Sequence, residues 1–424
     1  MEGNTKNPGQ RIAIVGSGIS GLTSAYLLSR NHNITVFEAE DYLGGHTHTV
    51  PVELEGQFHQ VDTGFIVCND RNYDNFMALM KQLGVKLQPT EMSFSVNNPA
   101  LNLEYNGHTL NTLFGQRLNL LRPRFYALVR DILRFNNASK KALRTDASTD
   151  MTLDEFISKQ NLGTWIRECY LLPMVAAIWS CSIRQAGEFP LRFFLRFFLN
   201  HGLLDIKNRP QWYVVKGGSH SYIRPMTRNF ADRTRLLSPV TAISRTAEGV
   251  EVRYKGRTEL FDQVILACHS NQALSLLNQP SKQEKNILSE LSYQENEVVL
   301  HSDPSLMPGN RRCWASWNFL AGERSMNSAP IVTYSMNILQ GLQSSSPLLV
   351  SLNASDRIAQ EKIIRRFRYA HPVYSTASVR AQQRRSEICG VDRIHFCGAY
   401  WYDGFHEDGV RSALDVAERF GERL

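Results

Sequence analysis

The sequence predicts an α/β fold whose main domain is built on a parallel β-sheet. Three observations lead to this prediction. A short apolar run, Arg11 to Val15, leads directly into the glycine-rich turn Gly16-Ser17-Gly18-Ile19-Ser20-Gly21. Apolar residues then recur at helical spacing, and a second apolar run, Ile34 to Phe37, ends at Glu38. A buried parallel strand, a crossover helix and a second strand produce this pattern.

The glycine-rich turn has the features of a dinucleotide-binding site. Gly16 permits a tight turn, Gly18 lets backbone N–H groups approach a pyrophosphate, and Gly21 lets the helix pack closely on the strand. The helix N-terminus, with Ser17, Ile19 and Ser20, faces the phosphates. Glu38 lies 22 positions after Gly16 and can accept hydrogen bonds from a ribose. This acid argues against the 2′-phosphate of NADP, and it leaves FAD and NAD open.

Length and composition set further limits on the protein. The chain has 424 residues, enough for two or three domains, and its 42 % apolar and 21 % charged residues describe a folded chain rather than a disordered one. No apolar run approaches the ~18 residues that cross a bilayer. The polar stretch Met1 to Gln10 lacks the apolar core of a signal peptide. Seven cysteines without a Cys-x-x-Cys pair indicate reduced thiols and no metal site, so we expect a cytoplasmic protein.

The net charge of +7 and the pI near 9.0 come from arginines spread along the chain. They occur in 117–134, 184–209 and 365–385, each time beside apolar residues. A nucleic-acid partner is not expected, because such proteins show a denser basic face. Two interpretations of the charge stay open. It is either a solvated surface, or it attracts an anionic substrate or the inner face of a membrane, which the protein would contact peripherally.

A second glycine motif separates FAD from NAD. Directly after Glu38 the chain reads Ala39-Glu40-Asp41-Tyr42-Leu43-Gly44-Gly45-His46. Here it resembles the flavin-containing amine oxidase and phytoene desaturase superfamily, in which such a glycine pair wraps the FAD pyrophosphate. The resemblance implies cofactor contacts from Ala39, Gly44, Gly45 and His46. The family usually has arginine at position 46, whereas a neutral imidazole donates one hydrogen bond and brings no permanent charge.

The middle of the chain carries motifs in the family's order. Val61 to Ile66 looks like the strand that passes close to the flavin ring, which implies contacts from Thr63, Gly64 and Phe65. Trp212 to Ser219 looks like the glycine pair where the chain re-enters the cofactor domain. Ser238 to Ile243 resembles the strand whose valine backbone bonds the adenine, and this places that role on Val240. Phe261 to Cys268 fits the next buried strand.

The last motif lies near the end of the chain. In the family, the glycine that corresponds to Gly398, followed here by Ala399, lies by the phosphates or the ribityl chain. The stretch Gly404 to Val410 opens a final amphipathic helix, and the resemblance implies that its N-terminus, with Gly409 and Val410, points at the flavin pyrimidine. A positive helix end there stabilises negative charge on the reduced ring. Cys397 stands where the family commonly has alanine, so we expect non-covalent FAD.

The resemblance also implies the domain organisation. It predicts a discontinuous, glutathione-reductase-type, Rossmann-like FAD-binding domain from residues 1–75, 208–290 and 386–424. A mixed α+β substrate domain is expected from residues 76–207 and 291–385. A capping box at Thr152 to Glu155 predicts a helical segment over 152–182. The run Leu191 to Leu199, with four phenylalanines and two arginines, is either a core helix with arginines at its rim or an interfacial, acyl-chain-binding helix.

Candidate catalytic residues come from two places. Many amine oxidases carry a lysine on the strand that corresponds to Glu297 to Asp303, and this chain has none there. His301 is the nearest titratable residue, to be weighed against an ordinary hydrogen-bonded core histidine. Before the final helix, Tyr402, Phe405 and His406 stand where the family has aromatic residues flanking the flavin, and such a surround excludes water from the ring.

The motifs Gly44 to Val50 and Phe405 to Gly409 resemble a narrower bacterial group of FAD-binding, amine-oxidase-like proteins linked to the modification of lipid acyl chains. The expected function is therefore an FAD-dependent oxidoreductase that moves a hydride between a C–H bond of an apolar, lipid-like substrate and the flavin. Three alternatives stay open: an amine oxidase using oxygen, a redox-neutral isomerase, and a non-catalytic flavoprotein.

Overall fold

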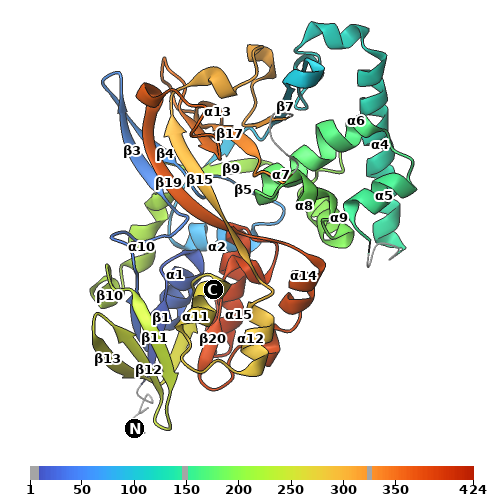
Figure 1. Ribbon diagram of the computed structural model, residues 1–424. Coiled ribbons are helices and arrows are strands. Elements are labelled where there is room, and N and C mark those ends of the chain that lie inside the picture. The colour runs from blue at the N-terminus through green and yellow to red at the C-terminus, as the bar shows by residue number, and fades with distance from the viewer. Residues whose placement is uncertain (1–8, 146–150, 322–326) are drawn as a thin grey trace.

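The computed structural model describes residues 9–145, 151–321 and 327–424, and these form two lobes (Figure 1). The lower lobe in that view holds a parallel sheet and the end of the chain, and the upper lobe holds a larger sheet with a group of helices beside it. Two long strands, β15 (Tyr293–His301) and β19 (Ile363–Pro372), run together between the lobes. Residues 1–8, which begin the first predicted segment and carry the expectation about secretion, lie outside the described residues.

A five-stranded parallel sheet confirms the predicted α/β class. Its strand order is β10-β2-β1-β14-β20, and each neighbouring pair is parallel. The strands are β1 (Arg11–Val15), β2 (Asn33–Phe37), β10 (Thr234–Arg235), β14 (Gln263–Leu266) and β20 (Ile394–Phe396). Three separated stretches of chain therefore build one sheet, as the motif order predicts. The domain boundaries themselves stay predictions.

Two helices on this sheet lie in direct contact. Helix α1 (Ile19–Leu28) follows the glycine-rich turn, and α15 (His406–Glu418) is the final helix. A Cβ on Gly409 would lie 2.6 Å from Ile19 Cγ2, so only glycine allows the helices to approach this closely. Since α15 begins at His406, Gly409 and Val410 lie one turn inside it rather than at its tip.

The upper lobe is organised around a seven-stranded mixed sheet of order β19-β15-β18-β17-β16-β7-β8. All of its neighbouring pairs are antiparallel except β16 with β7. Its other strands are β7 (Phe94–Asn98), β8 (Leu103–Asn106), β16 (Trp317–Leu320), β17 (Ile331–Ser335) and β18 (Leu349–Leu352). This lobe supplies the mixed α+β part that the sequence predicts.

Three smaller sheets complete the strand content of the described residues. One is antiparallel, with β11 (Val240–Arg245), β12 (Val250–Tyr254) and β13 (Arg257–Phe261). One is a hairpin of β3 (Thr49–Leu54) and β4 (Gln57–Asp62). The third joins β5 (Cys68–Asn69), β6 (Leu87–Thr90) and β9 (Trp212–Val215). The pairing of β5 with β9 connects the end of the predicted cofactor segment 1–75 with the start of the segment 208–290.

The remaining helices are distributed over both lobes (Figure 1). They are α2 (Asp74–Gln82), α3 (Leu110–Leu113), α4 (Pro123–Arg144), α5 (Leu153–Lys159), α6 (Thr164–Ile166), α7 (Leu172–Trp179), α8 (Ile183–Gly187), α9 (Leu191–Asn200), α10 (Ile223–Thr227), α11 (Ser270–Leu276), α12 (Lys282–Leu288), α13 (Met336–Leu339) and α14 (Thr376–Gln382). Within the ranges that the structure describes, no helix has the length and apolarity needed to span a bilayer.

The predicted helical segment over 152–182 is present but broken into pieces. The capping box is confirmed, because Glu155 N–H donates to Thr152 Oγ1 at 3.3 Å and Thr152 N–H donates to Glu155 Oε2 at 2.8 Å. The chain restarts as a helix after Gly163, and Ser180 ends α7 in the left-handed region with φ of 53°. The sequence pattern gives the helical character correctly and misses these interruptions.

Helix α9 is a core helix that also reaches the interior cavity described below. It buries Leu191, Phe194, Leu195, Phe197 and Phe198, whereas Arg196 lies exposed at its rim. The first of the two predicted interpretations therefore describes most of this helix.

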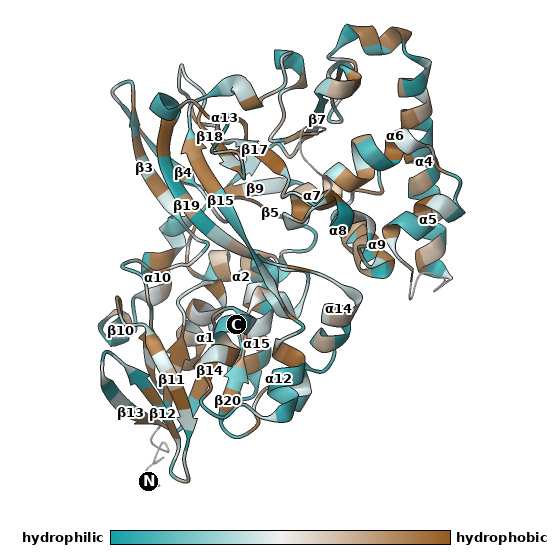
Figure 2. Cartoon of the chain, in the orientation of Figure 1, coloured by the Kyte–Doolittle hydropathy of each residue, from teal (hydrophilic) through white to brown (hydrophobic). Residues whose placement is uncertain are grey.

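Two hydrophobic cores hold the lobes. One surrounds the parallel sheet with α1 and α15, and the other joins the large sheet to the helices from α4 to α9. Hydrophilic and hydrophobic positions alternate along α4, as a helix with one buried face requires (Figure 2). Phe405 packs against both cores, so the start of α15 lies where the two lobes meet.

Candidate functional site: a cofactor cradle joined to an apolar chamber

A cavity of about 1040 Å³ lies between the two lobes. Its lower part is lined by residues that follow β1, β2 and β14, at the carboxyl ends of the parallel strands. This is the edge at which open parallel sheets bind ligands. Its upper part continues between the seven-stranded sheet and helices α7 and α9. The volume lies at the upper end of the usual range for ligand pockets.

The glycine-rich turn forms one wall of the lower part. Gly16 has φ of +103°, and a Cβ there would lie 2.8 Å from Ala267 O. A Cβ on Gly21 would lie 2.0 Å from Gly16 O, so the helix presses against the turn. A Cβ on Gly18 meets nothing within 4 Å, and this residue faces the open cavity. The first and third glycines are thus packing residues, and the second is open to a pyrophosphate.

Glu38 faces the same cavity from the end of β2. Its Oε2 accepts the Ser17 N–H at 2.9 Å, and its Oε1 accepts the Glu40 N–H at 3.0 Å. These bonds hold the carboxylate beside the glycine-rich turn, where it can accept hydroxyl groups of a ribose.

The second glycine pair lies directly against the first turn. Gly44 N–H donates to Ser17 O at 3.1 Å, and Gly45, with φ of +56°, would place a Cβ 3.2 Å from the Cα of Gly18. Together with Ala39, these residues line the cavity. The two motifs, more than twenty residues apart in sequence, form a single cradle of backbone. We call these residues, with Glu38, the cofactor cradle.

His46 follows the glycine pair and carries a polar atom without a partner. Burial and, to a smaller extent, the neighbouring His48 lower the pKa of His46 to about 4, so the ring is neutral at pH 7. Its Nε2 is buried and has no hydrogen-bond partner among the described residues. An unpaired buried nitrogen is costly, which indicates that this atom bonds a ligand when one is present.

The strand that was expected near the flavin ring packs against His46. Phe65 N–H donates to His46 O at 2.7 Å, and a Cβ on Gly64 would lie 2.2 Å from the same oxygen. The hydroxyl groups of Thr63 and Tyr369 share a hydrogen bond of 2.7 Å. Thr63, Gly64 and Phe65 all line the cavity.

Taken together, the predicted cofactor residues divide into two groups. Those that line the cavity are Gly16, Ser17, Gly18, Ile19, Ser20, Glu38, Ala39, Gly44, Gly45, His46, Thr63, Gly64, Phe65, Val240, Gly398 and Ala399. Gly21, Gly409 and Val410 do not line it, because they form the close contacts of α1 and α15 with their neighbours. A packing position beside the turn has the same sequence signature as a contact with the ligand.

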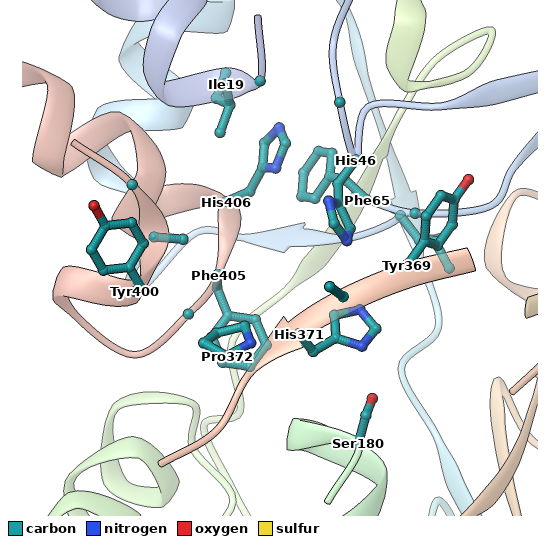
Figure 3. Close-up of a pocket in the computed structure, with 18 of the residues that line it drawn as sticks. Ile19, His46, Phe65, Ser180, Tyr369, His371, Pro372, Tyr400, Phe405 and His406 are labelled. Carbon is teal, nitrogen blue, oxygen red and sulfur yellow. The ribbon is translucent and has the colours of Figure 1, made fainter. Parts of the chain in front are cut away.

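The predicted catalytic residues also separate. Phe405 and His406 line the cavity, and they point toward the same space as His46 and His371 (Figure 3). Tyr402 lies away from the cavity, because its hydroxyl donates to Asp415 Oδ2 at 2.5 Å and Arg411 covers its ring at 4.0 Å.

His301 also lies outside the cavity lining. It is fully buried, and its Nε2 is 2.8 Å from Ser351 Oγ. The Asp303 N–H donates to its Nδ1 at 3.1 Å. This geometry describes the hydrogen-bonded core histidine that the sequence left open as the alternative.

Four histidines that line the cavity were missed from the sequence: His108, His201, His269 and His371. Two of them lie near the cofactor cradle. His269 follows β14, and His371 lies on β19 with its Nδ1 3.1 Å from Asn296 Nδ2. Burial, together with the neighbouring histidines, lowers the pKa of His269 to about 4 and that of His371 to about 3. His269 could have been found, since ligands bind at the carboxyl ends of parallel strands. His371 carries no sequence signal, because only the pairing of β15 with β19 brings it to the site.

The upper part of the cavity is mainly apolar, and we call it the chamber. Its apolar and aromatic side chains are Met92, Phe94, Tyr105, Tyr170, Met174, Ile178, Trp179, Phe197, Leu203, Trp212, Trp317 and Tyr334. Its polar residues are Ser93, Ser180, His108, His201 and Arg209. Of these, His108 and Arg209 are exposed, so the chamber meets the surface beside them. No carboxylate occurs among these residues; Glu295, exposed on β15, also lines the cavity.

The cofactor cradle fits FAD. The open face of Gly18 accommodates a pyrophosphate, Glu38 lies where a ribose binds, and the unpaired Nε2 of His46 needs a polar partner. The backbone N–H groups at the start of α1 supply the positive end of a helix to the phosphates. FAD, when bound, supplies the capacity to accept or return a hydride.

Comparison with known proteins agrees with this fit. The family model of flavin containing amine oxidoreductase matches residues 19–301. The chain is 25 % identical over 391 residues to an L-amino-acid oxidase of Siganus canaliculatus, which covers 82 % of this chain and 66 % of that protein. It spans about half to two thirds of the length of the curated relatives it matches.

Solved structures show the same fold. A fatty acid isomerase of P. acnes that produces CLA matches with a TM-score of 0.70 at 14 % identity, covering 97 % of this chain and 98 % of that one. A putrescine oxidase variant matches with a TM-score of 0.71 at 15 % identity and the same coverage. The family model covers well over half of the 424 residues. The chain therefore belongs to the family of flavin-containing amine oxidoreductases, which are FAD-dependent oxidoreductases, and FAD is its cofactor.

Proposed function

We propose that the protein moves a hydride between a C–H bond of an apolar, lipid-like substrate and non-covalently held FAD. The observation that carries the proposal is the chamber, which continues from the cofactor cradle and is lined mainly by aromatic and aliphatic side chains. An acyl chain or another extended hydrocarbon suits such walls, because burying apolar surface is favourable by about 25 cal/mol per Å².

The charges around the chamber favour this substrate class over amines. A protonated amine would enter past Arg209 and would find no carboxylate among the chamber residues named above, so its desolvation there would go uncompensated. Glu295, on β15, also lines the cavity, but it is exposed to solvent. The described strand β15 also lacks the lysine that many amine oxidases carry there. A neutral chain, or one that ends in an anionic group, avoids both penalties.

The protein's own residues then orient the reactants and exclude water. Phe65, Phe405 and His406 cover the junction between cofactor cradle and chamber. The nearby histidines His46, His269 and His371 have lowered pKa values and are neutral near pH 7. The junction therefore holds no fixed positive charge from imidazole. When a hydride leaves one C–H bond for the flavin, a proton must leave the adjacent carbon as the double bond forms. A neutral imidazole at the junction can accept that proton.

A non-covalent cofactor is supported by the cysteines. Of the seven, Cys268 is the one that lines the cavity, and burial raises its pKa to about 12. Burial likewise raises the pKa of Cys397 to about 12, and that side chain is fully buried. Both stay thiols at neutral pH, and a thiol is a poor nucleophile compared with a thiolate.

Anaerobic reduction of the purified holoprotein tests the proposal. Phosphatidylglycerol vesicles, free fatty acids and a set of small amines are mixed with it under argon, and loss of the flavin absorption near ~450 nm is followed. We expect bleaching with the lipids and none with the amines. Ile178→Gln, which places an amide in the chamber, should slow bleaching, and Ile183→Gln, outside the cavity lining, serves as its control.

Bleaching by amines alone would contradict the proposal and favour the amine oxidase alternative. A shift of double bonds in the lipid that needs pre-reduced flavin, with no reductant consumed, would instead show the isomerase alternative. The similar fold of a fatty acid isomerase gives a reason to include this arm. Release of hydrogen peroxide in air then distinguishes an oxidase from a dehydrogenase.

A further inference from the structure

Exposed leucines gather on one part of the upper lobe. Six of the thirteen large hydrophobic side chains that lie exposed among the described residues fall within residues 110–133. They are Leu110 (78 %), Leu118 (47 %), Leu120 (47 %), Leu121 (81 %), Tyr126 (48 %) and Leu133 (42 %). We call these six residues the leucine patch. Such a concentration marks an interaction surface, since single exposed leucines are ordinary but clusters are not.

Contacts and helix geometry bring several members of the patch near one another. Tyr126 donates from its hydroxyl to Leu120 O at 3.0 Å, and its ring lies 5.9 Å from that of Phe114. Phe114 in turn ends the short helix α3, with its N–H bonded to Leu110 O at 3.2 Å. Leu133 lies two turns beyond Tyr126 on α4, so it shares the same face of that helix.

Positive charge surrounds the leucine patch. Arg117, Arg122 and Arg124 lie within the same stretch, and none of the three forms an ion pair with a described acid. The one acid of the stretch, Asp131, is buried and paired with Arg130 and Arg134. Arg117 and Arg122 donate hydrogen bonds to Asn111, Phe114, Asn102 and Asn119, so their charges are held in place without an acid to neutralise them. Leucines flanked by such arginines match the chemistry of an anionic bilayer, which offers phosphates at its surface and acyl chains below them.

The mouth of the chamber lies beside the patch. The exposed residues Gly107 and His108 line the cavity, and Leu110 follows two positions later. Thr112 Oγ1 donates to Asn106 O at 3.1 Å, which ties α3 to the end of β8 at this mouth. A surface that docks on a bilayer here would bring the chamber entrance to the lipid.

We infer that the leucine patch with Arg117, Arg122 and Arg124 docks the protein on an anionic lipid bilayer. A second copy of the chain fits the surface less well, because a symmetric contact would bring the unpaired arginines of one copy near those of the other. The docking stands without the reaction, and only the idea that substrate enters from the bilayer rests on the proposed function.

Vesicle co-sedimentation of the holoprotein tests the inference without any turnover. The probes are vesicles of phosphatidylcholine alone and of phosphatidylcholine with phosphatidylglycerol. We expect binding to the anionic vesicles only, weakened by salt. The triple substitution L118N, L120N and L121N should reduce binding by roughly tenfold or more. The matched control is L236N with L237N, two leucines that are also exposed, 38 % and 58 %, in the lower lobe.

A charge-reversal variant measures the electrostatic contribution to vesicle binding separately from the contribution of the leucines. Arg124→Glu should reduce binding to anionic vesicles several-fold. Arg228→Glu, at an exposed position in the lower lobe, should leave it unchanged. Equal binding by the patch variants and their controls would overturn the inference, and so would a failure of the holoprotein to bind anionic vesicles. A change of the patch triple variant from dimer to monomer, without vesicle binding, would assign the surface to a second copy instead. An unchanged flavin spectrum in each variant shows that the fold and the cofactor site persist.

Discussion

The imidazole of His406 lies face to face with the ring of Phe65, with centroids 3.7 Å apart and planes inclined by 6°. Its Nε2 lies 2.7 Å from the hydroxyl of Tyr222, and burial lowers its pKa well below the usual value. The neutral ring therefore accepts the hydroxyl proton or donates its own to that oxygen, and cannot rotate freely. His406 begins α15 and Phe65 follows β4. The stacked pair therefore connects the first and last predicted cofactor segments of the chain beside the chamber.

Replacing His406 by alanine should destabilise the protein. The substitution removes the stacked ring and leaves the buried Tyr222 hydroxyl with a weaker set of partners, so the free energy of unfolding should fall by about 2–4 kcal/mol. Urea denaturation of the holoprotein measures this. His220→Ala, at a partly exposed histidine, is the control and should change the value by less than about 0.5 kcal/mol. Equal effects of both substitutions would show that the stack carries no special stability.

A methyl group on Gly18 should block the cofactor without disturbing the fold. A Cβ there meets no protein atom within 4 Å and points into the cofactor cradle. Because Gly18 is the N-cap of α1, where alanine is less favourable than glycine, Gly18→Ala should lower the unfolding free energy by about 1 kcal/mol in the absence of FAD. Its affinity for FAD should fall by roughly a hundredfold, since backbone groups can no longer approach the pyrophosphate. Fluorescence titration of the apoprotein with FAD measures the affinity.

Gly107→Ala is the matched control for Gly18→Ala. Gly107 also has no neighbour within 4 Å of its added Cβ and also lines the cavity, but at the chamber mouth. FAD affinity should stay unchanged in this variant. Loss of affinity in both variants would mean that the methyl group acts on the whole cavity rather than on a pyrophosphate site.

The carboxylate of Glu38 should contribute to cofactor affinity through the ribose. Glu38→Gln keeps the shape and removes the charged acceptor, so FAD should bind roughly tenfold more weakly. Isothermal titration of the apoprotein measures this directly. Glu40→Gln, an exposed neighbour that also lines the cavity, is its control. A larger effect at Glu40 would move the ribose contact to that side chain.

The buried histidines predict that the apoprotein loses stability in mild acid. The pKa values of His46, His269 and His371 are lowered to about 4, 4 and 3, whereas an unfolded histidine has its usual value of 6.5. Below pH 6.5 these three histidines bind protons in the unfolded chain but stay neutral in the folded chain until the pH approaches 4. Their contribution is thus present above about pH 6.5 and is lost as the pH falls toward 4. Asp62 acts in the opposite sense, because burial raises its pKa to about 6.

Urea denaturation from about pH 7 to about pH 4 checks this sign. The free energy of unfolding should fall by several kcal/mol over that range, and His46→Asn should make the fall shallower. The exposed His108→Asn should leave the slope unchanged. A flat profile in the unsubstituted protein would mean that these rings are not neutral in the folded state.

The cofactor cradle was predictable because its parts are local. Gly16, Gly18 and Gly21 lie within six residues at the junction of β1 and α1. Each is required by a local steric constraint, so the spacing of the glycines alone predicts the turn. The structure places all but three of the predicted cofactor residues along the cavity. Gly21 packs against the turn at Gly16, and Gly409 packs against Ile19 of α1, so close packing selects glycine at these positions as a ligand contact would. Val410 is fully buried in the core.

The chamber could not be predicted in the same way. Its walls come from β7, β16, β17, α7 and α9. These elements are far apart in the sequence, and no local sequence pattern predicts that they lie side by side. The pairing of β15 with β19 brings His371 to the cavity. His301, at the end of β15, faces Ser351 in the protein interior instead. Which side of a fully buried strand meets a cavity depends on its partners, since both faces are apolar.

The visible absorption spectrum of the purified protein, before and after heat release of the cofactor, tests the central claim most directly. We predict bands near ~370 and ~450 nm that move into the supernatant, as expected for one FAD held without a covalent bond in the cofactor cradle. A colourless protein that also fails to take up added FAD would contradict the account, and a yellow precipitate with a clear supernatant would contradict the non-covalent attachment.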